Sequence, residues 1–122
     1  MKEDNCRNIF SQTLLIAIEQ LKSRSLDSAY NLIKNALFVN PDAPEPHNLL
    51  GILAELKGDD SIARKHYRAA YALDPTYKPA CRNLERLVVF EWGPQRRDYD
   101  FGDIQTESVG AMKEDIKNEG NR

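Results

Sequence analysis

The chain has few of the residues that hold small proteins together covalently. Only two cysteines, Cys6 and Cys81, occur in 122 residues, and they stand far apart with no metal-ligand spacing around them. Two thiols without a framework spacing are typical of reduced cysteines in a reducing compartment. The sequence therefore predicts no structural disulfide.

Long hydrophobic runs and an excess of one charge are also missing. The apolar run at residues 14–18 is far shorter than the roughly 20 residues of a membrane-spanning helix. The start of the chain lacks the basic, apolar and small-residue layout of a signal peptide. Lys and Arg (17) nearly balance Asp and Glu (19), and they are scattered, so no basic face for nucleic acid or membrane is expected. We expect a cytoplasmic protein.

Patterns that carry catalysis are missing too. We find no glycine-rich phosphate loop, no serine–histidine–acid set and no pair of carboxylates with catalytic spacing. His47 and His66 lack the ligand spacing of a zinc or catalytic site, although Glu45 and Glu55 are near in sequence. We interpret His47 as a packing residue and expect neither an enzyme nor a metal or cofactor site.

What the chain does contain is an internal repeat. Three residues recur 34 positions later, and the set comprises Ala29, Ala36 and Pro41, matched by Ala63, Ala70 and Pro75. Between them lie Ile33 in the first segment and Tyr67 in the second. Self-similarity at a fixed period indicates a repeat architecture, and 34 residues is the period of the tetratricopeptide repeat (TPR).

Residues 44–75 resemble a TPR unit. The matching positions are Leu50, Gly51, Ala63, Tyr67, Ala70, Asp74 and Pro75. Two positions depart from the family pattern, with His47 where a Trp is usual and Ala54 where a Tyr is usual. The segment before it is more diverged and has Ile16 and Ala17 in place of Leu50 and Gly51. The resemblance extends over residues 10–90.

The resemblance implies an all-α fold, a short right-handed TPR α-solenoid. It divides the chain into a TPR domain at 1–92, with repeat 1 at about 10–43, repeat 2 at about 44–77 and a capping helix at about 77–91. Helices are expected at about 5–23, 26–39, from 44–46 to just before Gly58, 60–73 and 77–91. In the last helix, the expected inward residues are Cys81, Leu84, Leu87 and Val88. Two repeats are fewer than the three usually needed, so the tail or a second copy of the chain is expected to cover core.

The polar C-terminal tail, residues 93–122, is expected to be largely irregular, with a weak helix at 107–118. Its one aromatic cluster is acidic and spans residues 98–104. Three alternatives remain open for this stretch. It binds the groove of its own chain and inhibits it, it binds a neighbour's groove and builds a homodimer, or it stays free as polar termini often do.

TPR proteins bind peptides or helices along a concave groove lined by the first helix of each pair, so the resemblance implies a protein–protein interaction module, an adaptor or scaffold. The residues at groove-lining positions are Leu14, Ile18, Leu21, Asn48, Ile52, Glu55, Leu56, Arg82, Arg86 and Val89. The arginines would suit an acidic residue of the partner. Because Leu14 and Ile18 cannot donate hydrogen bonds, recognition of a chaperone's terminal carboxylate is not expected.

Two other interpretations compete with this one. The apolar groove positions could simply complete a small core, leaving Arg82 and Arg86 as a solvated face. Alternatively, the chain is a self-assembling structural protein whose tail or first helix mediates a homo-oligomer.

Overall fold

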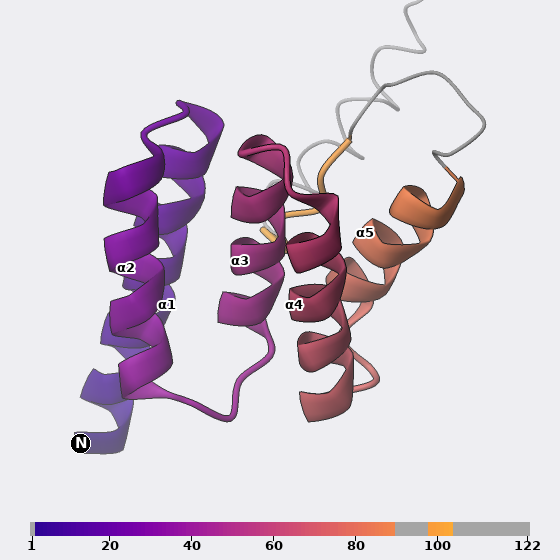
Figure 1. The fold of residues 1–122 in the computed structure, drawn as a ribbon. Coiled ribbons are helices and arrows are strands. Elements are labelled where there is room, and N and C mark those ends of the chain that lie inside the picture. The colour runs from indigo at the N-terminus through magenta and orange to yellow at the C-terminus, as the bar shows by residue number, and fades with distance from the viewer. Residues whose placement is uncertain (1, 90–97, 104–122) are drawn as a thin grey trace, which may run out of the picture.

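The structure is a computed structural model that describes residues 2–89 and 98–103. Five helices and no strand occur in these ranges (Figure 1), which confirms the all-α prediction: α1 (Lys2–Lys22), α2 (Leu26–Val39), α3 (Glu45–Leu56), α4 (Asp60–Leu73) and α5 (Lys78–Val89). The bounds of α2 and α4 are those expected from the sequence, and α1 begins earlier. The weak helix expected at 107–118 lies outside the described residues.

The helices form two hairpins that stand side by side, with α5 added at one end (Figure 1). The closest packing is within the hairpins, of α1 on α2 and of α3 on α4. Contacts between the hairpins run mainly from α2 to α3, and fewer from α1 to α3. Helix α5 packs against α4 and so covers the outer side of the second hairpin.

Small residues set the distance between the helices of each hairpin. A Cβ atom added to Gly51 in α3 would overlap the ring of Tyr67 in α4, so the tyrosine lies directly on the bare backbone. In the first hairpin, Ala17 and Ala29 are both fully buried. Helices pack at 8–10 Å only where the side chains at the contact are small enough, which explains glycine and alanine at these positions.

The turns inside the hairpins use the same backbone conformation at equivalent positions. Arg24 after α1 and Gly58 after α3 are 34 residues apart, and both have positive φ angles, 65° and 87°. This left-handed conformation ends a helix readily. The caps differ, because the Asp59 carboxylate accepts a hydrogen bond from the Ile62 amide at 3.1 Å whereas Ser25 makes no side-chain cap.

The inward face of α5 differs from the expected one. Its buried residues are Pro79, Ala80, Asn83 and Leu87, whereas Cys81 is half-buried and Val88 is 62% exposed. The expectation that Val88 faces inward was wrong, whereas Cys81 and Leu84 are both half-buried. The apolar pattern did not predict that a polar residue, Asn83, would be inside. Asn83 is buried because its amide is hydrogen-bonded on both sides, as described below.

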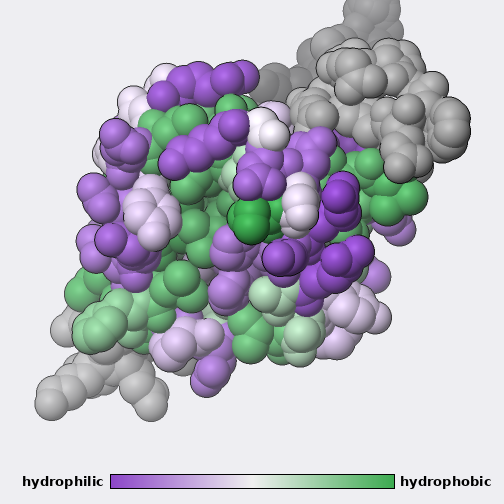
Figure 2. Space-filling model, in the orientation of Figure 1, coloured by the Kyte–Doolittle hydropathy of each residue, from purple (hydrophilic) through white to green (hydrophobic). Residues whose placement is uncertain are grey.

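The face of the molecule that carries α2 and α4 has a mixed surface. Figure 2 shows this face, to which α2 and α4 contribute, with hydrophilic side chains spread between apolar ones. Among the residues whose side chains the structure describes, the most exposed large apolar one is Phe38 near the end of α2, at 89%. Within the described residues, every helix is too short or too polar to cross a lipid bilayer.

Candidate functional site

Part of the C-terminal tail lies against α1, α3 and α5. We call residues 98–103 the tail segment, and the surface of these three helices that contacts it the groove. Asp100 contacts side chains of α3 and α5, and Asp103 contacts Lys22 at the end of α1. Tyr99 and Phe101 are half-buried and pack against the main hydrophobic core. In Figure 1 the segment, drawn in light orange, passes behind α3 and α4.

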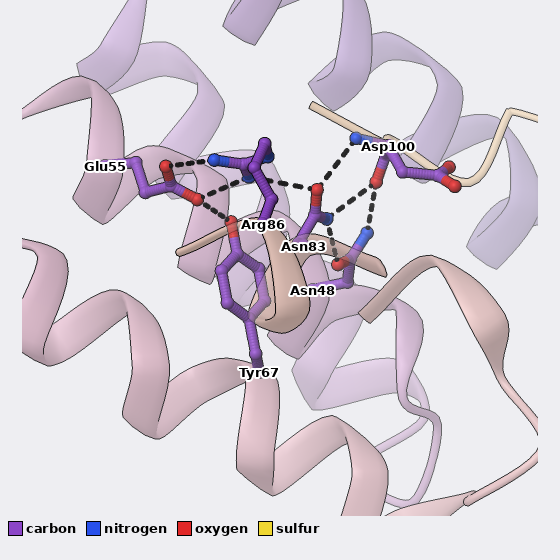
Figure 3. Close-up of polar contacts among 6 residues, drawn as sticks. All are labelled: Asn48, Glu55, Tyr67, Asn83, Arg86 and Asp100. Atoms are coloured by element: carbon purple, nitrogen blue, oxygen red, sulfur yellow. Dashed lines mark hydrogen bonds and ion pairs between the residues drawn. The ribbon is translucent and has the colours of Figure 1, made fainter. Parts of the chain in front are cut away.

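Two asparagines bind the main chain of a single tail residue (Figure 3). The carbonyl oxygen of Asp100 accepts hydrogen bonds from Asn48 Nδ2 and from Asn83 Nδ2, both at 2.9 Å. The amide N–H of Asp100 donates to Asn83 Oδ1, also at 2.9 Å. Asn83 therefore pairs with the N–H and the C=O of the same residue, as a neighbouring strand would in a sheet.

Arg86 sets the orientation of these amides. Its Nη2 donates to Asn83 Oδ1 at 3.1 Å, and because a guanidinium has donors and no acceptor, the oxygen of Asn83 must face it. The nitrogen of Asn83 then points to the other side, where it donates to Asn48 Oδ1 at 2.8 Å. This leaves Asn48 Nδ2 to donate to the tail segment. The two amides thus present a defined order of donors and acceptors.

A buried ion pair holds Arg86 in turn. Arg86 Nη1 and Nη2 donate to the two carboxylate oxygens of Glu55 at 2.8 and 2.7 Å, and the Glu55 side chain has no exposed surface. The Tyr67 hydroxyl donates to the same carboxylate at 2.6 Å, and burial raises the pKa of Tyr67, which keeps it a donor. Burial lowers the pKa of Arg86, but its bonds to Glu55 outweigh this and raise it. The network runs from the core to the groove surface (Figure 3).

Cations contact two acidic side chains of the tail segment. Arg82 Nη1 lies 2.6 Å from Asp100 Oδ2, and Lys22 Nζ lies 2.8 Å from Asp103 Oδ2. The second oxygen of Asp100 accepts from the Gly102 amide at 3.0 Å. Partly exposed pairs of this kind contribute up to about 1 kcal/mol each, so they favour an acidic segment without dominating its binding.

The two aromatic side chains of the segment each lie under a cation. The Arg86 guanidinium is 5.0 Å from the ring centre of Tyr99, and Lys22 Nζ is 5.1 Å from that of Phe101. The two rings meet edge to face, with centres 6.1 Å apart. Cation–π contacts at partly exposed sites contribute about 0.5–1 kcal/mol each. Arg86 therefore serves both the buried ion pair and the groove.

Glycine is required at position 102. Its φ angle is +78°, and a Cβ atom there would overlap the hydroxyl of Tyr77. Burial, and then the nearby charge of Glu45, raises the pKa of Tyr77, so the hydroxyl is neutral. At Gly102 the chain therefore passes closer to Tyr77, in the turn between α4 and α5, than a residue with a Cβ atom would allow.

Two pockets flank the tail segment. One, of about 170 Å³, adjoins its end and is lined on the helix side by Leu14, Leu15, Ile18 and Leu49 among others. The other, of about 200 Å³, lies beside Tyr99 and Phe101 and is lined by Leu21 and Leu56. The first pocket is bounded largely by apolar side chains of α1 and α3, whereas the second is also lined by the cations Lys22 and Arg24.

The structure distributes the expected groove residues over three environments. Ile18, Leu21 and Ile52 are buried in the core, and Leu14 and Leu56 pack half-buried against it. Asn48 and Arg82 contact the tail segment directly, whereas Glu55 and Arg86 form the ion pair beneath it. The side chain of Val89 lies outside the described residues.

Sequence reasoning missed three residues that contact the segment: Lys22, Tyr77 and Asn83. One signal was present for Asn83, since it shares a helical stripe with Ala80 and Leu87. A polar residue on an apolar stripe indicates a buried hydrogen-bonding site.

The two histidines lie together, His47 in α3 and His66 in α4. The rings of His47 and His66 stack with centres 5.8 Å apart. Burial lowers the pKa of both, and repulsion from His47 further lowers that of His66. Within the part of the chain that the structure describes, no group of three or more His, Cys, Asp or Glu side chains is placed to hold a metal ion.

Comparison of the chain with models of protein families, with curated proteins and with solved structures finds no match. Any function must therefore be inferred from the residues of the groove themselves.

Proposed function

We propose that this chain is a TPR-type protein–protein interaction module whose groove binds an extended segment of a partner protein. The observation that carries the proposal is the pairing of Asn48 and Asn83 with the main chain of Asp100. A site that binds main-chain atoms accepts a peptide through groups that every residue has, and the side-chain contacts around it then select among peptides.

The burial of the two asparagines supports this role. Asn48 and Asn83 are 0% and 1% exposed, yet both direct hydrogen-bonding groups to the tail segment. A buried polar group left without a partner costs about 1–3 kcal/mol, so such groups favour a bound peptide over an empty groove. A surface that merely completed a core would be more stable with apolar side chains at these positions.

Equivalent burial at equivalent positions supports the repeat. Ile33 and Tyr67 are both fully buried, as are the alanines that flank them, Ala29, Ala36, Ala63 and Ala70. The helices α2 and α4 begin and end 34 residues apart. This is the relation expected of two copies of one helix-turn-helix unit.

The proposal is tested by a peptide-display screen on the full chain carrying Tyr99→Ala and Phe101→Ala, which removes the aromatic contacts of the tail segment. We expect peptides to be enriched, and their binding to be lost when Asn83→Asp is added. A screen that enriches no peptide, or peptides whose binding is unchanged by Asn83→Asp, would show that the groove is not a peptide site.

The alternative is a homo-oligomer in which tail segments exchange between chains. In the structure the segment contacts the groove of its own chain, and exchange would keep the same contacts. Light scattering distinguishes the two arrangements: our proposal expects a monomer for the full chain, and a dimer that dissociates with Tyr99→Ala and Phe101→Ala would favour exchange.

A further inference from the structure

We infer that the groove selects partner segments that read, from N to C, aromatic, aspartate, aromatic, glycine, acidic residue, and that the tail segment is a built-in competitor with this pattern. The inference rests on the proposed function and specifies its ligand. Each of the five positions, 99–103, contacts the groove, and Lys22 contacts two of them.

The direction and register of the bound peptide follow from the two asparagines. Asn83 offers its oxygen to a peptide N–H and its nitrogen to the C=O of the same residue. Arg86 prevents the amide from turning over, because a flipped amide would bring its NH₂ group against the guanidinium. A peptide running in the opposite direction would exchange its N–H and C=O positions, and both hydrogen bonds to Asn83 would be lost.

The second position favours aspartate over glutamate. One oxygen of the Asp100 carboxylate accepts from Arg82 while the other accepts from the amide of Gly102, two residues later. The bond to the amide two residues on is the Asx-type turn that a short side chain makes with its own backbone. A longer glutamate side chain would not hold both contacts in this geometry.

The aromatic positions flank the aspartate and lie beneath Arg86 and Lys22. An aliphatic residue of similar size would fill the space without the attraction between a cation and a ring face. Lys22 also contacts the carboxylate at position 103, so a single cation serves the third and fifth positions of the pattern.

The fourth position is the most restrictive. The positive φ angle disfavours every residue with a Cβ atom, and Tyr77 leaves no space for one. Any residue with a Cβ atom would therefore need both a strained backbone and a shift of the Tyr77 hydroxyl. Replacing this glycine should therefore weaken binding more than a substitution at a position of the segment that does not need a positive φ angle.

Occupancy by the tail segment makes the groove selective for strong or abundant ligands. A partner must displace a segment on the same chain, whose effective concentration is of millimolar order for a short linker. The apparent dissociation constant is then raised by the reciprocal of the fraction of chains with an open groove.

The test uses the full chain with Tyr99→Ala and Phe101→Ala and a labelled, end-blocked peptide Asp-Tyr-Asp-Phe-Gly-Asp, titrated by fluorescence anisotropy. Two matched peptides serve as controls, one with the change Gly102→Ala and one with the reversed sequence, which has the same composition and charge. We expect the first peptide to bind at least tenfold more tightly than either control. We also expect the unsubstituted chain to bind it at least tenfold more weakly than the variant.

The outcomes separate the ligand pattern from the proposed function. Equal binding of the three peptides would overturn the pattern while leaving a peptide-binding groove. Equal binding by the variant and the unsubstituted chain would overturn the competition by the tail. No binding of any peptide, together with display peptides that depend on Asn83, would overturn the pattern alone. No binding in both experiments would overturn the proposed function as well.

Discussion

At the scale of single residues, the groove depends on buried side chains whose orientation is fixed by hydrogen bonds to one another. Asn83 is held between Arg86 and Asn48, and Arg86 is held by Glu55. Each bond in this series fixes the donor or acceptor that the next residue presents. A substitution that changes one atom from donor to acceptor should therefore weaken the hydrogen bonds between the groove and the tail segment.

The substitution Asn83→Asp tests this directly because it keeps the shape of the side chain. The carboxylate can still accept from Arg86, but it can no longer donate to the Asp100 carbonyl or to Asn48. Loss of buried hydrogen bonds should lower the free energy of unfolding by about 1–3 kcal/mol and release the segment. Urea denaturation measures the first effect, with the exposed Asn35→Asp as the matched control. An equal effect of both substitutions would contradict the role of Asn83.

Gly51→Ala is the second prediction at this scale. Helix propensity alone favours alanine by about 1 kcal/mol. The added Cβ atom would overlap the ring of Tyr67, whose hydroxyl is tied to Glu55 and cannot shift freely. Overpacking typically costs about 1–3 kcal/mol, so we expect net destabilisation in thermal unfolding. A higher melting temperature for Gly51→Ala than for the unsubstituted chain would show that the Tyr67 ring shifts at little cost.

Residues of the groove were only partly predictable from the sequence. Asn48 and Arg82 stand at groove positions of the repeat pattern, and both contact the tail segment. Asn83 stands one position away from Arg82 and was missed, because the repeat pattern places a leucine, Leu49, at the equivalent position of α3. Its burial depends on partners distant in sequence, which local patterns do not report.

At the scale of the helices, local signals determine most of the fold. The bounds of α2 and α4 were predictable because each helix is followed by Asn40-Pro41 or Asp74-Pro75, and α4 is preceded by a glycine and a capping aspartate. Arg24 adopts the left-handed conformation of its glycine counterpart, Gly58, so the repeat position overrides the residue type. The position of the tail segment could not be predicted from the sequence, because its contacts with three helices depend on residues that are distant along the chain.

The contact of α3 with α4 should make stability depend on pH through His47 and His66. Their pKa values are lowered in the folded protein, so the unfolded chain, with a usual histidine pKa near 6.5, binds more protons at mildly acid pH. The contribution to stability is therefore complete above about pH 6.5 and falls as the pH drops below it. Hydrogen bonds to Thr76 lower the pKa of Asp74, but that carboxylate affects stability only near pH 4 and below.

The measurement is the urea midpoint at pH 7.5 and at pH 5.5. We expect a lower midpoint at pH 5.5, and a smaller difference in the double variant His47→Gln with His66→Gln. A difference of the same size in both proteins would assign the pH dependence to other groups.

At the scale of the whole molecule, the proposed function treats the helices as a peptide receptor whose groove the tail segment occupies. The helices supply hydrogen bonds to the main chain of Asp100 and cations that contact two rings and two carboxylates of the segment. Gly102 of the segment lies close to the Tyr77 side chain. Because two hairpins and α5 form a small array, the segment also covers apolar surface of α1 and α3. Release of the segment should thus expose the groove and lower stability together.

The most direct test of this account is the hydrogen exchange rate of the Asp100 amide in the full chain, measured by NMR at neutral pH. This amide donates to Asn83, so we expect exchange at least tenfold slower than in an unstructured peptide of the same sequence. The protection should be lost in Asn83→Asp and on addition of excess Asp-Tyr-Asp-Phe-Gly-Asp peptide. Exchange at the unstructured rate in the unsubstituted chain would show that the groove does not hold its own tail.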